Sequence, residues 1–470
     1  MAAAHFLSRL LTLGGDDRIT VPGGQNTNRY GASPFPRSTL GYASSTANDI
    51  SLPAFRHLAG LMEQWPEDAL SDDGFYAAAL EGMRGRIRQG WGLDEGTAIV
   101  FAPSGTDLEY VPLALAGGPV VNVLIGADEV GSGCVLSAAG RYFADRTAVA
   151  ERTEKGAVVE GLEGTGLVDI AVRETCGRPR SSADITRRIE NIASAAHQEG
   201  RDCLVHVVYG SKTGLVLPDL ADLDRLRARY PGMRFVVDAC QARLSPGDLG
   251  ALIERGCIVL LTGSKFMGGP PFSGMALVPA DWTPPASLPR GLAAIFRRGE
   301  WPADWTGCDH LPRGANPGLL LRLEAALFEL ERFRALDEAN VREVIAAFAR
   351  HVALLSDALG TALVAPCLTG DGLHTSTLAT LDLSVLPSAP DIAVAQRWHR
   401  VLAARGLRLG QPVKCIPLPG VGWGGTLRLS LSMPLIAELS CLSPGTLEAR
   451  LSGDMGMIRS VLSAAQKGVA

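Results

Sequence analysis

Two stretches of the sequence decide the fold prediction: Phe235-Val236-Val237-Asp238-Ala239-Cys240-Gln241-Ala242 and Leu261-Thr262-Gly263-Ser264-Lys265-Phe266-Met267-Gly268-Gly269. In each, a short apolar run that is typical of a buried strand leads to a charged side chain, Asp238 in the first and Lys265 in the second. In open α/β sheets, ligands bind outside the carboxyl ends of the strands. We therefore expect both side chains at one edge of a sheet, facing a common ligand.

Similar apolar runs recur on both sides of these stretches. The expected strands are residues 98–102, 120–125, 168–172, 203–209, 234–238, 257–261 and 275–278. Stretches with helical periodicity lie between them, at residues 182–197, 220–230 and 249–254. This alternation predicts an α/β fold with a mainly parallel central sheet.

The pattern changes towards both ends of the chain. Residues 1–50 carry turn-forming dipeptides and polar residues, and we predict that they form an N-terminal arm. Beyond a proline-rich segment at 279–312, residues 319–334 and 341–359 predict long helices, and residues 378–383 and 427–432 predict strands. We therefore predict a large domain over 51–318 and a small α+β domain over 319–470.

Composition narrows the classes of function. The 470 residues are 47% hydrophobic and 20% charged, as in globular enzymes, and the net charge of -5 gives no support to nucleic-acid binding. No apolar run approaches the roughly 20 residues of a membrane span, and the N-terminus lacks signal-peptide features, so we expect a cytoplasmic protein. The nine irregularly spaced cysteines predict free thiols. No metal site is expected, because Cys203 and His206 would point to opposite faces of one strand.

Asp238 and Lys265 are the pair that a pyridoxal-phosphate (PLP) enzyme requires. A carboxylate keeps the pyridine nitrogen of PLP protonated, and a lysine amine holds the cofactor as a Schiff base. Gln241 lies three residues after Asp238, within reach of the phenolic oxygen of such a cofactor. Simpler alternatives are that Asp238 caps a turn and that Lys265 is a surface lysine.

Hydroxyl-bearing residues supply candidates for holding the cofactor phosphate. Ser104-Gly105-Thr106 follows the strand at 98–102 and offers hydroxyls and backbone N–H groups to an anion. Thr262 and Ser264, beside Lys265, are further candidate donors. The same Ser-Gly-Thr segment is also an ordinary helix cap, and that alternative stays open.

These segments resemble the class V aminotransferase group of fold type I PLP enzymes, which includes cysteine desulfurases, selenocysteine lyases and kynureninases. Val237-Asp238-Ala239-Cys240-Gln241-Ala242 is similar to the group's Val-Asp-Gly-Ala-Gln-Ala segment, and Thr262-Gly263-Ser264-Lys265 to its Ser-Gly-His-Lys segment. The resemblance spans residues 98 to 432. It implies the cofactor roles given above for Asp238, Gln241 and Lys265.

Two further matches imply shared active sites. Gly210-Ser211-Lys212-Thr213-Gly214 is similar to the group's Ser-Asn-Val-x-Gly loop, which implies that Ser211 lies beside the phenolic oxygen. Gly314-Ala315-Asn316-Pro317-Gly318 resembles a segment that completes the phosphate site of a neighbouring subunit. The resemblance thus implies that Asn316 binds cofactor and that the protein is a homodimer.

Arg428 is the candidate for binding the substrate carboxylate. Alternation in Leu427-Arg428-Leu429-Ser430-Leu431-Ser432 puts the leucines on one face of a strand and Arg428 on the other. Arg428 resembles the group's carboxylate-binding arginine, whose guanidinium can grip a carboxylate at two points. The alternative is an exposed strand arginine.

The sequence departs from the group's pattern at positions that affect the reaction. Where a ring usually stacks on PLP, the chain reads Ile125-Gly126-Ala127-Asp128-Glu129, so Asp128 or Glu129 is a candidate acid/base, unless these acids merely begin a helix. Ser264 replaces the histidine common in desulfurases. The only candidates for a desulfurase cysteine are Cys367 and Cys415, the second beside Lys414, a cation that favours thiolate.

We therefore predict a PLP-dependent enzyme, a lyase or transferase, that acts on a small amino-acid substrate through a Lys265 aldimine and a carbanion or quinonoid intermediate. The altered ring position favours lyase-type or carbon–carbon bond-forming chemistry, of the decarboxylative aldolase or carbon–sulfur lyase kind. The alternatives are, in order, a class V aminotransferase, a cysteine desulfurase and a catalytically silent binding protein with this fold. No nucleic-acid or membrane partner is expected.

Overall fold

The computed structural model describes residues 2–43, 45–127, 129–131, 133–364, 375–420 and 422–467. Its largest sheet, within these residues, has eight strands, seven of them in the order β2-β9-β8-β7-β5-β3-β4, with β6 paired to β5. The strands are β2 (Ala98–Ala102), β3 (Val120–Ile125), β4 (Gly166–Ile170), β5 (Asp202–Tyr209), β6 (Val216–Leu217), β7 (Arg234–Asp238), β8 (Ile258–Thr262) and β9 (Gly274–Val278). The pairs β4-β3, β3-β5, β5-β7 and β7-β8 are parallel, whereas β9 runs antiparallel to both β8 and β2. The prediction of a mainly parallel sheet is confirmed.

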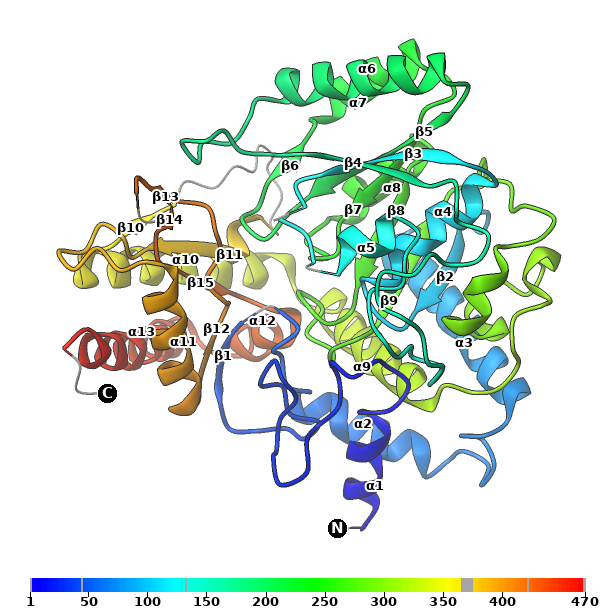
Figure 1. The fold of residues 1–470 in the computed structure, drawn as a ribbon. Coiled ribbons are helices and arrows are strands. Elements are labelled where there is room, and N and C mark those ends of the chain that lie inside the picture. The colour runs from blue at the N-terminus through cyan, green and yellow to red at the C-terminus, as the bar shows by residue number, and fades with distance from the viewer. Residues whose placement is uncertain are drawn as a thin grey trace.

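Helices cover both faces of this sheet because alternate strand residues point to opposite sides. One face packs against α3 (Asp73–Trp91), α6 (Ser182–Gln198), α7 (Leu220–Arg229) and α8 (Pro246–Glu254). The other face packs against α4 (Tyr110–Ala116) and the proline-rich segment, whose three tryptophans are buried there. Figure 1 shows α6 and α7 on one side of the sheet and α4 and α5 (Cys134–Ala138) on the other.

The C-terminal part, yellow to red in Figure 1, is built around a three-stranded sheet in the order β10-β11-β15. Its elements are α10 (Glu338–Leu359), β10 (Ala362–Leu363), β11 (Leu378–Asp382), α11 (Ile392–Ala404), β12 (Leu407–Leu409), β13 (Pro417–Leu418), β14 (Gly422–Trp423), β15 (Thr426–Ser430), α12 (Met433–Leu439) and α13 (Pro444–Gln466). Helix α9 (Pro317–Arg334) contacts α2 (Leu52–Met62), α3 and α12, so it joins this part to the large sheet. The domain boundary near residue 318 remains a proposal.

The N-terminal segment contributes more structure than an arm of turns. Helix α1 (Ala2–Leu10) buries Leu7 and Leu10 against α2 and α9. Strand β1 (Leu40–Tyr42) pairs in parallel with β12 of the C-terminal part. In Figure 1 this blue segment runs between α9 and the C-terminal elements, and several of its residues reach the cavity described below. No helix in the described part of the chain is long and apolar enough to cross a membrane.

Candidate active site

A cavity of about 300 Å³ lies where β5, β7 and β8 end. It is lined by eleven of the residues predicted from the sequence, namely Ser104, Gly105, Thr106, Glu129, Ser211, Asp238, Gln241, Thr262, Ser264, Lys265 and Arg428. These residues come from segments more than three hundred positions apart in the sequence. The fold therefore brings together the residues that the sequence singled out, with two exceptions that are given below.

The Ser104-Gly105-Thr106 turn combines a helix cap with a cavity wall. The Ser104 hydroxyl accepts the backbone N–H groups of Thr106 and Asp107 at 3.2 and 3.3 Å, and donates to the Asp107 carboxylate at 2.5 Å. A Cβ at Gly105 would lie 2.9 Å from the Cγ2 atom of Thr262, so only glycine leaves this wall unobstructed. The Ser104 hydroxyl thus caps the turn, whereas the cap residue of the short helix at Asp107–Glu109 is Thr106, and the turn still faces the cavity.

Asp107 is a buried carboxyl directly behind this turn. Burial, and then the nearby Asp16 carboxylate, raise its pKa to about 7, against a lowering by Arg18 and by the Ser104 hydrogen bond. The anion-binding candidate therefore has a titratable group next to it.

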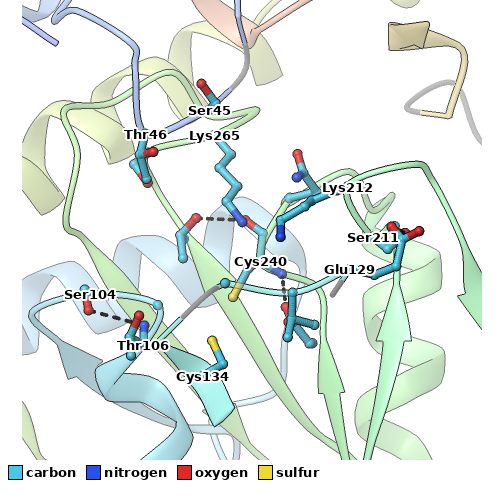
Figure 2. A pocket seen from close by; sticks show the side chains of 18 of the residues that line it. Ser45, Thr46, Ser104, Thr106, Glu129, Cys134, Ser211, Lys212, Cys240 and Lys265 are labelled. Carbon is cyan, nitrogen blue, oxygen red and sulfur yellow. Dashed lines mark hydrogen bonds between the residues drawn. The ribbon is translucent and has the colours of Figure 1, made fainter. Parts of the chain in front are cut away.

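Asp238 and Lys265 both face the cavity, from the ends of neighbouring strands. The Oδ1 atom of Asp238 accepts the Cys240 N–H at 2.9 Å, which is the turn-capping contact expected as an alternative, and the residue still lines the cavity. Figure 2 shows the Lys265 side chain directed towards Cys240, which lies in the turn after β7, two residues beyond Asp238. Its backbone carbonyl accepts the amide of Asn48 at 3.1 Å, so the N-terminal segment fixes the lysine loop.

The hydroxyl of Thr262 is engaged within the protein, so its role as a phosphate donor stays a prediction that this geometry does not favour. Its hydroxyl donates to the Cys240 carbonyl at 2.8 Å, and a hydroxyl has a single proton to give. Thr262 instead fixes the turn between Asp238 and Gln241. Ser264 is buried on the cavity wall, and its role stays a prediction.

Glu129 lies in the cavity wall, but its carboxylate is engaged. It forms an ion pair with Arg173 at 2.9 Å and accepts the hydroxyls of Ser211 at 2.9 Å and Thr213 at 3.0 Å. Glu129 does not begin a helix, since α5 begins at Cys134. These contacts make Glu129 and Ser211 parts of one buried cluster that holds the loop after β5, which argues against a free acid/base. Asp128 lies outside the described residues.

Arg428 is buried at the cavity, contrary to the exposed-arginine alternative. Its Nε donates to the Gln411 carbonyl at 2.9 Å and its Nη1 donates to the Lys212 carbonyl at 3.1 Å. Burial lowers its pKa to about 10, so the guanidinium stays charged at neutral pH. Nε and Nη1 are thus engaged with backbone carbonyls, and the side chain lines the cavity.

Of the two exceptions, Asn316 is the one that lies within the described residues. It does not line the cavity of its own chain. Its Oδ1 accepts the Leu319 N–H at 3.0 Å, capping α9, and its Nδ2 donates to the Gly14 carbonyl at 3.1 Å. Both ends of the amide are thus used within one chain. Its role at a second subunit's site remains a prediction that this geometry does not favour.

Cys415 is unsuited to the thiolate chemistry that its neighbour Lys414 suggested. It is buried away from the cavity, and burial raises the pKa of its thiol to about 11. At neutral pH Cys415 is a protonated core residue, so the prediction that Lys414 favours its thiolate form is wrong. Cys367 lies outside the described residues.

Sequence reasoning missed the residues that the N-terminal segment brings to the cavity: Arg18, Tyr30, Ser45 and Thr46. It also missed Lys212, whose side chain points into the same space as Lys265 in Figure 2. Burial, and then the nearby charges of Lys265 and Arg428, lower the pKa of Lys212. The signal for Lys212 was present, because it follows Ser211 in the loop already matched to a cofactor loop. Nothing in the local pattern around Arg18 pointed to the site.

The fold predicted from the sequence is confirmed, because the chain superposes over most of its length on solved PLP-dependent enzymes of fold type I. A serine palmitoyltransferase from Sphingomonas wittichii superposes with a TM-score of 0.54 at 12% identity, covering 91% of this chain and 87% of that one. Pyridoxamine-pyruvate aminotransferase from Mesorhizobium loti gives 0.53 at 15% identity, over 90% and 97% of the two chains. A NifS-like protein gives 0.55 at 12% identity, over 90% and 99%. At these identities the likeness concerns the fold. No protein-family model and no curated protein matches the sequence.

Proposed function

We propose that this protein is a PLP-dependent enzyme that acts on an amino acid. The observation that carries the proposal is the meeting of Lys265 and Asp238 in one cavity, at neighbouring strand ends. The donor set fits the cofactor: an amine for its aldehyde, a carboxylate for its pyridine nitrogen, and the Ser104 to Thr106 turn for its phosphate. The wall at Gly105, which a Cβ would obstruct, supports the fit. When bound, PLP supplies an electron sink for charge that develops at the substrate α-carbon.

The residues of this chain then have separate tasks. Arg428 binds the substrate carboxylate and so orients the bonds at the α-carbon. Lys265 accepts and returns the proton that moves at the α-carbon. The cluster around Glu129 holds the loop that carries Lys212. The backbone carbonyl of Lys212 accepts a hydrogen bond from Arg428, so the cluster keeps both cations in place.

Within this class we propose lyase-type or carbon–carbon bond-forming chemistry. The support is the cavity wall after β3, where Val130 and Gly131 stand in place of a ring stacked on the cofactor. The aromatic side chains of the described wall are Tyr30 and Phe272, and Phe272 packs against Arg18. The second candidate is a transaminase, which the same donor set would serve.

Incubation of the PLP-loaded protein with single amino acids separates the two candidates. A lyase or carbon–carbon bond-forming enzyme returns PLP unchanged and releases a fragment or condensed product. Conversion of the bound cofactor to the pyridoxamine form, with one equivalent of keto acid, would sink the lyase proposal. The Lys265→Ala variant is the control, because it keeps the cavity but loses the amine.

We propose further that the protein is a cytoplasmic homodimer. The support is the resemblance of residues 314–318 to a segment that reaches a neighbouring subunit, although the amide of Asn316 itself is used within its own chain. Light scattering of the full chain tests the dimer, and a monomer of full activity would exclude shared sites.

A further inference from the structure

We infer that Arg18, carried into the cavity by the N-terminal segment, is a ligand for the phosphate of the cofactor. The inference rests on the proposed function and adds to it a residue outside both expected domains. It makes residues 11–18 part of the cofactor site, rather than an arm that packs elsewhere.

The contacts of Arg18 with the predicted phosphate turn are the first support. Its Nη1 donates to the Thr106 hydroxyl at 3.0 Å and its Nη2 donates to the Ser104 hydroxyl at 3.1 Å. One edge of the guanidinium thus lies against the two hydroxyls that were predicted to face an anion. These contacts and those with Asp16 use four of the five N–H groups of the guanidinium, and the second N–H of Nη1, beside the two hydroxyls, remains for a phosphate oxygen.

The other edge of the guanidinium holds it in that orientation. Nε and Nη2 form a forked ion pair with Asp16, at 2.8 Å and 2.6 Å. The guanidinium carbon lies 4.7 Å from the ring centroid of Phe143 and 5.0 Å from that of Phe272, so the plane is held by two aromatic faces. The side chain is only 15% exposed. A long side chain held in this way loses little further entropy on binding an anion.

The backbone of Phe272, which packs against Arg18, is strained. Its φ of 71° lies in the left-handed region, which a residue with a Cβ rarely adopts. Such strain persists only where surrounding contacts fix it, and it gathers at ligand sites. The Phe272 carbonyl accepts the Nε of Arg322 at 2.7 Å, which holds the strained residue against Arg18.

Arg322 also fixes the N-terminal segment. It is completely buried in α9, and its Nη groups donate to the carbonyls of Leu11, Leu13 and Gly14. Gly14 has a φ of +62°, and a Cβ there would overlap the Asn316 side chain at 1.7 Å. The chain is therefore tied to α9 just before Asp16 and Arg18, and this tie sets where the guanidinium lies.

The test compares two cofactor forms that differ only in the phosphate. PLP and pyridoxal are titrated into the apo full-length chain, and the visible absorption that develops on binding gives each affinity. Removing Arg18 alone would leave Asp16 unpaired beside the phosphate, so the main variant is the double change Asp16→Asn with Arg18→Met. Arg18→Lys keeps the charge but not the fork. The matched control is Arg37→Met, which breaks a similar pair with Asp49 in the same segment but outside the cavity.

We expect the double variant to bind PLP roughly tenfold to a hundredfold more weakly, in line with the loss of a hydrogen bond to a charged group, while pyridoxal binding is unchanged. Arg18→Lys should give an intermediate ratio of the two affinities, and Arg37→Met the wild-type ratio. An unchanged ratio in Arg18→Lys and in the double variant would overturn the inference. If the double variant does not fold by circular dichroism, the ratio in Arg18→Lys decides. Failure of the wild-type chain to bind either form would instead refute the proposed function.

Discussion

Asp107 gives the folded protein a stability that falls as the pH rises. Its pKa is raised from 3.8 to about 7, first by burial and then by Asp16. A carboxyl with a raised folded-state pKa contributes stability that is fully present below the unfolded-state pKa and is lost as the pH rises through the folded-state pKa. The window is therefore about pH 4 to pH 7. A difference of about 3 units corresponds to about 4 kcal/mol of unfolding free energy over the whole window.

Asp107→Asn removes this titration and keeps an oxygen for the Ser104 hydroxyl. Between about pH 5 and about pH 8.5 the ionisation of Asp107 costs the wild-type protein roughly 3 kcal/mol, because about 2 of the 3 units fall in that interval. The variant should therefore gain that amount relative to wild type when the pH is raised. Urea unfolding at both pH values, followed by circular dichroism, measures the difference.

Asp72→Asn is the matched control. Asp72 caps α3 from an exposed position, and asparagine is an equally good cap, so this change should alter stability equally at both pH values. If Asp107→Asn also gave the same change at both pH values, Asp107 would not be a buried titrating group, and the electrostatic description of the phosphate turn would be refuted.

Three further changes test other parts of the site. Gly105→Ala should weaken PLP binding about tenfold or more, because its Cβ would press on Thr262. Gly82→Ala is the control, because nothing lies near its Cβ, and it should leave PLP binding unchanged. Equal PLP titration curves for the two variants would contradict the obstructed wall. Arg428→Lys should raise KM for the amino-acid substrate by roughly tenfold to a hundredfold, since ammonium cannot form the fork, and an unchanged KM would remove Arg428 from substrate binding. Cys415→Ala should leave turnover within about twofold of wild type, and loss of activity would reinstate a cysteine mechanism.

The strands of the large sheet could be predicted because burial on both faces leaves continuous apolar runs. β2, β3 and β7 begin and end at the predicted residues. β4 begins two residues before its predicted start, and it lies at the edge of the sheet, where Val168 is exposed and the apolar signal is weaker. Helix α3 was missed although its buried residues Tyr76, Leu80, Met83, Ile87 and Trp91 have regular helical spacing.

The site could be predicted where its residues lie at strand ends, and not where distant segments meet. Asp238 and Lys265 follow recognisable strands, so the rule for strand ends places them. Arg18 lies 88 positions from Thr106, and the hydrogen bonds of Arg322 and Asn316 to the N-terminal segment help to bring it there. Likewise, the hydrogen bond from the Thr262 hydroxyl to the Cys240 carbonyl depends on the register between β7 and β8, which residue patterns do not encode.

The most direct test of the proposed function is to find where PLP attaches. The full-length chain is mixed with PLP, reduced with borohydride, digested and examined by mass spectrometry. We expect one modified lysine, Lys265, and no incorporation into the cavity in Lys265→Ala. Modification at Lys212 with Lys265 untouched, or no modification at either residue, would contradict the central claim.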